Sequence, residues 1–381
     1  MCRRLSLLLV LVCGSFCFPG KTPAGPSAAL VPFIETGSIA GAVTLVADGE
    51  KVLSLEAIGY SDVKAKTVIK TDAVFWIASM SKPITGVGLM MLVDEGKISL
   101  DDPAEKYLPE LKDMWVAAYK DNDSVLLKRP KTKITVRQLM DHTSGMSFAS
   151  AMEKPTLDHL SIRDSVLSYA MTPLNSEPGT KYAYSNAGIN TAGRIIEVVS
   201  KMPYEEFMDK RVFQPLGMKD TTFWPSDSQL ARLAKAYKPA ADKKSLEETN
   251  IWALAYPLTD RKRQPMPGGG LFSTAEDVGK LCQMVLNGGT RGNTRFLSEK
   301  SVQAMTSRST PKELPNNYGI GWAIGDGWHG HGGAFATDMV VNTKAGLVFV
   351  YLVQHAGFLN DGSKGKAAFQ QAALAKFGKT K

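Results

Sequence analysis

Strand-like segments stand at the two ends of this chain, and helix-like segments fill its middle. Residues 39–59 read as a hairpin, with β-rich runs on either side of an Asp48-Gly49 turn. Strand patterns return only late in the chain, at residues 318–324, 337–342 and 346–354. Strands at both ends share one core only if the two ends of the chain meet. We therefore predict an α+β fold, in which an antiparallel sheet from the N- and C-terminal segments is flanked by helices and a mostly helical subdomain is inserted between them.

The middle segments carry apolar residues at helical spacing and are broken by Pro and Gly. The predicted helices cover residues 89–93, 136–140, 162–169, 187–199 and 204–212, and a further helix-like segment spans 365–378. A chain of 381 residues with 44% hydrophobic content can bury one large core or two coupled subdomains. We expect one domain over residues 30–381, with an α/β part at about 30–78 and 265–381 and a helical part at about 79–264.

Residues 1–20 have the layout of a secretory signal peptide, since two arginines precede an apolar run and then small residues. The run is too short for a comfortable membrane span, and residues 21–29 read as a linker. We expect a secreted or periplasmic protein with no stable membrane span after cleavage. Cys13 and Cys17 leave lipoprotein anchoring as an alternative, although Val12 and Phe16 stand where such sites need a small residue.

Cleavage would leave Cys282 as the only cysteine of the mature chain, which excludes an intrachain disulfide. Cys282 continues an apolar stripe of helical spacing with Val278, Leu281 and Val285, so we expect a core residue and not a nucleophile. The formal net charge is +8, and the basic residues are scattered. A nucleic-acid site would need a concentrated basic patch with stacking aromatics, so no nucleic-acid partner is predicted.

Ser79 and Lys82 lie where a short apolar run meets a polar turn and then a long apolar segment. If Ser79 starts a helix, Lys82 follows one turn later on the same face. A serine hydroxyl is a poor nucleophile at neutral pH, and a neighbouring amine whose charge is disfavoured can take its proton. The helix start adds N–H donors where an oxyanion would form. The alternative is a capping serine beside a solvated lysine.

Two further motifs follow in order, Tyr184-Ser185-Asn186 and His331-Gly332-Gly333-Ala334. This order resembles the serine β-lactamase and penicillin-binding-protein family, which carries Ser-x-x-Lys, then Tyr-x-Asn, then Lys-Thr-Gly or His-x-Gly. Class C β-lactamases, D-stereospecific peptidases and carboxylesterases of family eight have the most similar pattern. The segments 134–146, 213–223 and 266–278 match too, so the resemblance covers nearly all of residues 30–355.

The resemblance implies that Ser79 is the nucleophile and Lys82 its activating partner. Tyr184 would be a general base and acid, hydrogen-bonded between Ser79 and Lys82, and a nearby ammonium would lower the pKa of its hydroxyl. Asn186 would orient the substrate and hold Lys82. Asparagine is also a common helix cap, so capping stays open as its role.

The third motif would complete the oxyanion hole with the backbone N–H groups of Ser79 and Ala334, while His331 and Gly333 help to orient the substrate. His331 and Gly332 stand where penicillin-recognising relatives have a lysine and a threonine, which would hold the carboxylate of a β-lactam. A histidine near its neutral form is a weaker anion anchor. An arginine folded into the site, such as Arg261 or Arg263, could replace the lost charge.

These observations predict a secreted serine hydrolase that forms an acyl-enzyme on Ser79, most simply an esterase acting on a small-molecule ester or peptide. The alternatives are a D-amino-acid peptidase, a β-lactamase, acyl transfer to an acceptor other than water, and a non-catalytic cell-wall-binding pseudoenzyme. No cofactor is implied. His329 and His331 would lie on one side of a strand, but no third ligand is evident, so no metal site is predicted. The oligomeric state is left open.

Overall fold

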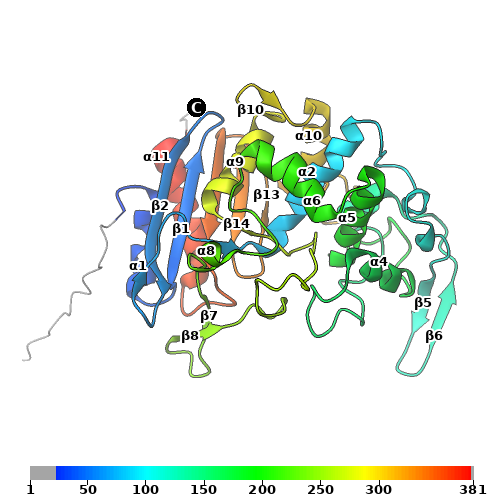
Figure 1. The fold of residues 1–381 in the computed structure, drawn as a ribbon, viewed down its shortest axis with the longest axis horizontal. Coiled ribbons are helices and arrows are strands. Elements are labelled where there is room, and N and C mark those ends of the chain that lie inside the picture. The colour runs from blue at the N-terminus through cyan, green and yellow to red at the C-terminus, as the bar shows by residue number, and fades with distance from the viewer. Residues whose placement is uncertain (1–22, 379–381) are drawn as a thin grey trace, which may run out of the picture.

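The computed structural model describes residues 23–378 of the chain, so the predicted signal peptide, residues 1–20, lies outside the described residues. A seven-stranded antiparallel sheet forms the frame of the molecule (Figure 1). Its strands, in spatial order, are β12 (Ala323–Gly325), β13 (Trp328–Gly332), β14 (Asp338–Asn342), β15 (Leu347–Leu352), β1 (Gly41–Ala47), β2 (Val52–Asp62) and β3 (Thr67–Val68). β1 pairs with β15, and Val43 lies opposite Leu352. The two ends of the chain therefore meet in one sheet, which confirms the predicted fold class.

Helices cover both faces of this sheet. The outer face carries α1 (Val31–Glu35) and α11 (Gly365–Phe377), and the inner face carries α9 (Ala275–Leu286) (Figure 1). Every residue of β1 is buried, because its alternate side chains enter the cores on opposite faces. Residues 26–30 form a 3-10 turn that packs beside α11, and its Ser27 is buried. Residues 26–29, which the sequence analysis placed in a linker, are therefore packed against the folded domain.

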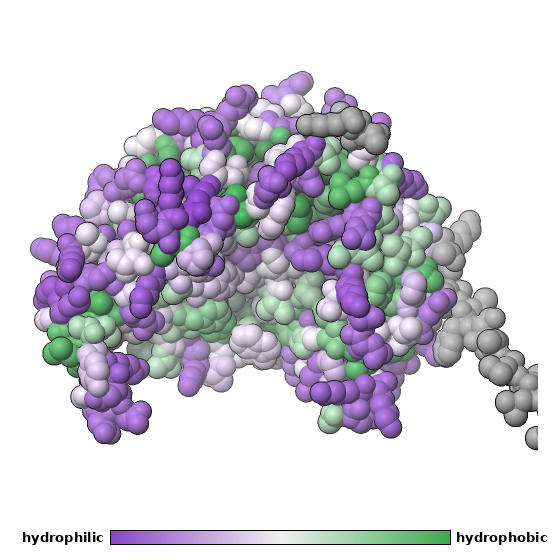
Figure 2. Space-filling view, turned by 180° about the vertical axis from the view of Figure 1, so that it is seen from behind, coloured by the Kyte–Doolittle hydropathy of each residue, from purple (hydrophilic) through white to green (hydrophobic). Residues whose placement is uncertain are grey.

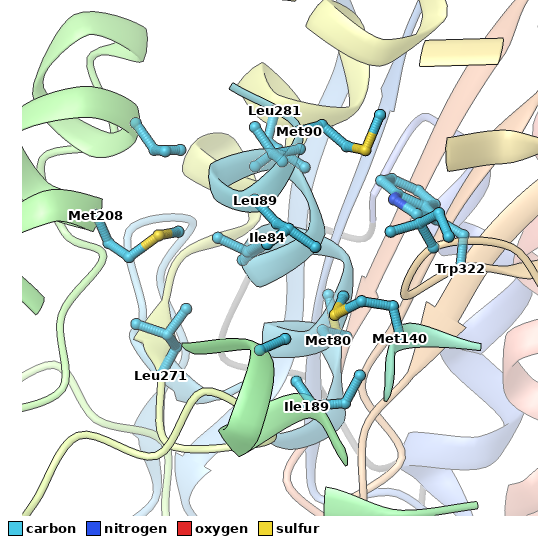
Figure 3. Packing of buried hydrophobic residues seen from close by; sticks show 14 of the residues in the cluster. Met80, Ile84, Leu89, Met90, Met140, Ile189, Met208, Leu271, Leu281 and Trp322 are labelled. Carbon is cyan, nitrogen blue, oxygen red and sulfur yellow. The ribbon is translucent and has the colours of Figure 1, made fainter. Parts of the chain in front are cut away.

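The middle of the chain is mostly helical. It contains α2 (Ser81–Asp94), α3 (Val136–Met140), α4 (Ile162–Ala170), α5 (Asn186–Ser200), α6 (Tyr204–Met208), a π-helical segment (Asp209–Phe213), α7 (Gln214–Leu216) and α8 (Asp227–Leu230), while α10 (Glu299–Thr306) follows α9. The predicted helices all fall within these elements or overlap them. α2 is buried from Ser81 to Leu92. Side chains from both parts of the molecule surround it, including Met140, Ile189 and Trp322 (Figure 3).

Four short strand pairs were not predicted from the sequence. They are β4 (Phe75–Trp76) with β9 (Phe272–Ser273), β5 (Val116–Lys120) with β6 (Val125–Lys128), β7 (Ala236–Pro239) with β8 (Leu246–Thr249), and β10 (Thr290–Arg291) with β11 (Thr294–Arg295). Most of β5 and all of β6 are exposed, so these strands lack the apolar alternation of a half-buried strand. Both the β5–β6 and the β7–β8 hairpins project from the body (Figure 1).

Seen from behind, the molecule is hollowed along its lower margin between two projecting lobes (Figure 2). Cys282 is a free, fully buried core residue within α9, as the apolar stripe predicted. Among the helices of residues 23–378, none combines the length and the apolar composition that a membrane crossing requires.

Candidate active site

Ser79 lies in a sharp turn that leads into the central helix. The turn is a 3-10 segment over Ala78–Met80, and α2 begins at Ser81, so Ser79 stands just before the α-helix and not inside it. Ala78 has a φ of 47°, a left-handed conformation that non-glycine residues rarely adopt and that stores strain. Ser81 Oγ donates to Ala78 O at 2.7 Å and accepts the Leu271 N–H at 3.2 Å. The Ser81 hydroxyl therefore links the turn that carries Ser79 to the Leu271 backbone and holds the turn in place.

Lys82 is fully buried directly behind Ser79. Its Nζ donates to Ser79 Oγ at 3.1 Å, to Asn186 Oδ1 at 2.7 Å and to Gly268 O at 2.6 Å. These three acceptors use all three ammonium protons, and none of them is a carboxylate. Burial lowers the pKa of Lys82 well below its usual value. The alternative of a solvated lysine is wrong, and the amine is placed to take the Ser79 proton.

Tyr184 lies over the same lysine. Its ring centroid is 4.7 Å from Lys82 Nζ, and its hydroxyl is 3.5 Å from His331 Nε2. Lys82 therefore faces the ring of Tyr184, not its hydroxyl. Burial raises the pKa of Tyr184, and a hydrogen bond with Ser79 offsets only part of that rise. The pKa shift is therefore opposite to the predicted direction, because desolvation of the hydroxyl is the largest contribution. A neutral phenol at this place can relay a proton.

Asn186 holds the lysine and does not cap the helix. It is the first residue of α5, whose N-cap is Ser185. Ser185 Oγ accepts the Gly188 N–H at 3.0 Å, so the cap is already supplied. The Asn186 amide oxygen is free to accept from Lys82. The capping alternative for Asn186 is therefore wrong.

A buried histidine supports Tyr184 from the far side. His142 is fully buried, its Nδ1 accepts the Ser185 N–H at 3.2 Å, and its ring lies 4.4 Å from the Tyr184 ring and 4.7 Å from the Tyr318 ring, measured between centroids. The sequence analysis predicted neither the Tyr318 contact nor the Gly268 carbonyl. No local pattern signals either one, because both reach the site only through tertiary contacts.

The third motif brings β13 against the nucleophile turn. The His331 ring faces Tyr184, and His331 Nδ1 donates to Gly332 O at 2.6 Å. Burial and the nearby Lys82 lower the pKa of His331 to about 3, so its ring is neutral at pH 7. Its Nε2 is then an acceptor that faces the Tyr184 hydroxyl. The Ala334 N–H has no protein acceptor among the described residues, which leaves it available to an oxyanion.

Gly333 permits this close approach. A Cβ on Gly333 would lie 2.1 Å from Thr337 Oγ1 and 2.6 Å from Ile77 O, just before the Ser79 turn. We therefore expect Gly333→Ala to displace the end of β13 and to lower kcat/KM at least about tenfold, because a 1 Å misplacement of catalytic groups can cost a hundredfold. Gly332→Ala is the matched control, since the nearest atom to its Cβ would be 3.5 Å away. Steady-state kinetics and melting temperatures of both variants test this, and equal activity in the two would contradict it.

The arginines that might have supplied a cation are engaged elsewhere. Arg263 is buried and donates to Asp158 Oδ2 at 2.7 Å, and its guanidinium also binds two backbone carbonyls. The Arg261 guanidinium stacks on Trp224 at 4.9 Å. Among the described residues there is also no group of three His, Cys, Asp or Glu that could hold a metal ion.

Comparisons with known proteins show what this chain and its fold are similar to. The family described as "Beta-lactamase" matches residues 27–373. "Protein Rv1367c" of Mycobacterium tuberculosis is 31% identical over 366 residues, which cover 87% of this chain and 90% of that protein. The solved structure of "EstCE1, a hydrolase with promiscuous acyltransferase activity" is similar with a TM-score of 0.76 at 23% identity, covering 91% of this chain and 97% of that one. The D-amino acid amidase of Ochrobactrum anthropi SV3 has a TM-score of 0.71 at 21% identity, covering 92% and 98%.

Proposed function

This chain belongs to the β-lactamase family, and on that premise we propose that it is a serine hydrolase that forms an acyl-enzyme on Ser79 and prefers ester substrates. One observation carries the proposal: the Nζ of the buried Lys82, whose pKa is lowered, lies 3.1 Å from Ser79 Oγ. A binding module has no need for a desolvated lysine behind a half-buried serine. The intact set of Ser79, Lys82, Tyr184 and Asn186 argues against the pseudoenzyme alternative.

In the proposed reaction, neutral Lys82 accepts the hydroxyl proton as Ser79 Oγ attacks the ester carbonyl. The backbone N–H groups of Ser79 and Ala334 stabilise the oxyanion. The proton that Lys82 took from Ser79 is passed on to the leaving alkoxide with Tyr184 as its last donor, so the alkoxide departs as an alcohol, Ser79 is left acylated and Lys82 is neutral again. Water then attacks the acyl group, the same groups return the protons, and the acid is released. An alcohol in place of water would give acyl transfer.

The preference for esters rests on what surrounds the third motif. His331 is neutral at pH 7 and Gly332 has no side chain, so neither offers a charge to a substrate carboxylate. Arg261 and Arg263 bind other groups. Esters are also more reactive than amides and need no such anchor. The likeness to EstCE1, a hydrolase with acyltransferase activity, is consistent with acyl-enzyme chemistry, and the amidase neighbour keeps D-amino-acid amides and peptides as the alternative. The pattern of residues 1–20 supports export.

A substrate panel tests the proposal. Purified protein would be assayed with short-chain p-nitrophenyl esters, a chromogenic cephalosporin and D-Ala-D-Ala peptides side by side. We expect ester turnover with the highest kcat/KM. Turnover of the peptide or the cephalosporin near the ester rate would replace the esterase proposal with the matching alternative, and no turnover of any substrate would favour the pseudoenzyme.

The preference for esters over β-lactams should depend on the residues of the third motif, His331 and Gly332. A charge-assisted contact contributes about 1.5–3 kcal/mol, so its absence weakens β-lactam selection by about ten- to a hundredfold. We expect the double change His331→Lys with Gly332→Thr to raise cephalosporin turnover relative to ester turnover. Gly332→Thr alone controls for the added side chain. A ratio that stays the same in the double variant would contradict the role assigned to these two positions.

A further inference from the structure

A line of buried hydrogen bonds runs from Lys82 into the helical part of the molecule. Lys82 Nζ donates to Gly268 O at 2.6 Å, and the Gly268 N–H donates to Asn190 Oδ1 at 2.9 Å. Asn190 Nδ2 donates to the Tyr169 hydroxyl at 3.0 Å, and that hydroxyl donates to Glu153 Oε1 at 2.5 Å. All four side chains are at least 97% buried. Nothing in the proposed reaction uses Glu153, Tyr169 or Asn190.

The direction of every bond in this line is fixed by chemistry. An ammonium and a backbone N–H can only donate, so the Asn190 oxygen must face Gly268 and its NH₂ must face Tyr169. Tyr169 then accepts from Asn190 and passes its own proton towards Glu153. All donors therefore point from Lys82 towards Glu153.

An amine and a carboxyl group stand at the two ends of this line, and neither group forms an ion pair among residues 23–378. Lys82 is faced by Tyr184, by His142 and by His331, and burial lowers the pKa of both imidazoles. Glu153 accepts from the Tyr169 hydroxyl at 2.5 Å and from the Ser150 N–H, which donates to Oε2 at 2.7 Å, and burial raises the pKa of its carboxyl group. Burial lowers the pKa of Lys82 and raises the pKa of Glu153, because a buried charge without a partner is costly for either group.

We propose that Glu153, Tyr169 and Asn190 are positioning residues, which fix the Gly268 carbonyl against Lys82 and make the Glu153 carboxylate the remote counter-charge of the lysine. This inference rests on the proposed function. The line keeps the amine aimed at Ser79 while leaving it without a contacting carboxylate, which would hold it permanently as an ammonium. Glu153 thus influences the pKa of Lys82 although the two side chains are not in contact.

Two substitutions of opposite sign test the proposal. Glu153→Gln removes the negative charge, so the Lys82 ammonium is less stable. The part of the pH profile of kcat/KM that reports deprotonation of Lys82 should therefore move to lower pH by about 0.5–1 unit. In Asn190→Asp, the new carboxylate can still accept the Gly268 N–H, but it places a negative charge closer to Lys82. The same part of the pH profile should therefore move to higher pH. KM for a short-chain p-nitrophenyl ester should stay within about twofold of wild type in both variants, because neither residue touches the substrate.

Ser168→Ala is the matched control, because the Ser168 hydroxyl is buried in the same region and binds Ser150 Oγ at 2.7 Å outside the line. It should change the melting temperature without moving the pH profile. Shifts of the same sign in Glu153→Gln and Asn190→Asp, or profiles that match Ser168→Ala, would overturn the proposal. If Glu153→Gln does not fold, the direction of the Asn190→Asp shift decides alone. Covalent labelling of wild-type Ser79 tests the proposed function separately, so an unmoved profile in an active enzyme overturns only this inference.

Discussion

Ser79→Ala is expected to abolish covalent labelling and to lower kcat/KM for esters by at least about 10⁴-fold, since removal of a serine nucleophile leaves only the catalysis of binding and the oxyanion hole. Ser79 is half-buried, and its Oγ lies 3.1 Å from Lys82 Nζ. Of the three groups that bind this amine, only the Ser79 hydroxyl has a proton to give up, since the other two are carbonyl oxygens. A fluorophosphonate probe should therefore add its mass to the peptide that contains Ser79 in the wild-type protein.

Ser144→Ala is the control for this experiment. Ser144 is buried and its Oγ accepts the Met146 N–H at 3.3 Å, so it has a structural bond and no contact with Lys82. This variant should keep both labelling and turnover. Label on Ser81 or Ser144, or turnover that survives Ser79→Ala, would show that the nucleophile is assigned to the wrong residue.

Lys82→Ala and Tyr184→Phe are each expected to lower kcat/KM by about 10²–10⁴-fold, the usual contribution of a positioned acid or base. Because both residues serve one proton-transfer route through Ser79, the double variant should be about as inactive as the worse single variant. A double-mutant cycle of kcat/KM measures this directly. Lys82→Met, which retains most of the buried volume, separates the loss of the amine from the loss of packing.

Tyr182→Phe provides the matched control for Tyr184→Phe. Tyr182 lies two residues earlier and its ring packs edge-on against His142, 5.7 Å away between centroids. Its hydroxyl takes no part in the proposed proton route, so its loss should leave kcat/KM within about threefold of wild type. Losses that multiply in the Lys82→Ala/Tyr184→Phe variant would mean that the two residues act independently.

The sequence by itself determined the frame of the molecule and the members of the site. β15 is apolar throughout and is buried throughout, and the helix-like segments of the middle became α2 to α6 because apolar spacing and caps act over a few residues. The three motifs singled out Ser79, Lys82, Tyr184, Asn186 and His331 as candidates, and these side chains lie next to one another in the structure. The β5–β6 hairpin escaped prediction because it is mostly exposed and buries only Val116 fully, which leaves no alternating pattern.

Only the tertiary structure decided the charges within the site. Lys82 and Asn186 are 104 residues apart in sequence, and Lys82 and Gly268 are 186 apart. The elements that pack around Lys82 and Tyr184 remove water from both, which lowers the pKa of the lysine and raises that of the tyrosine. The Gly268 carbonyl and the line to Glu153 likewise exist only where distant segments meet. Desolvation depends on which distant segments pack around a side chain, so it cannot be predicted from the residues next to that side chain in the sequence.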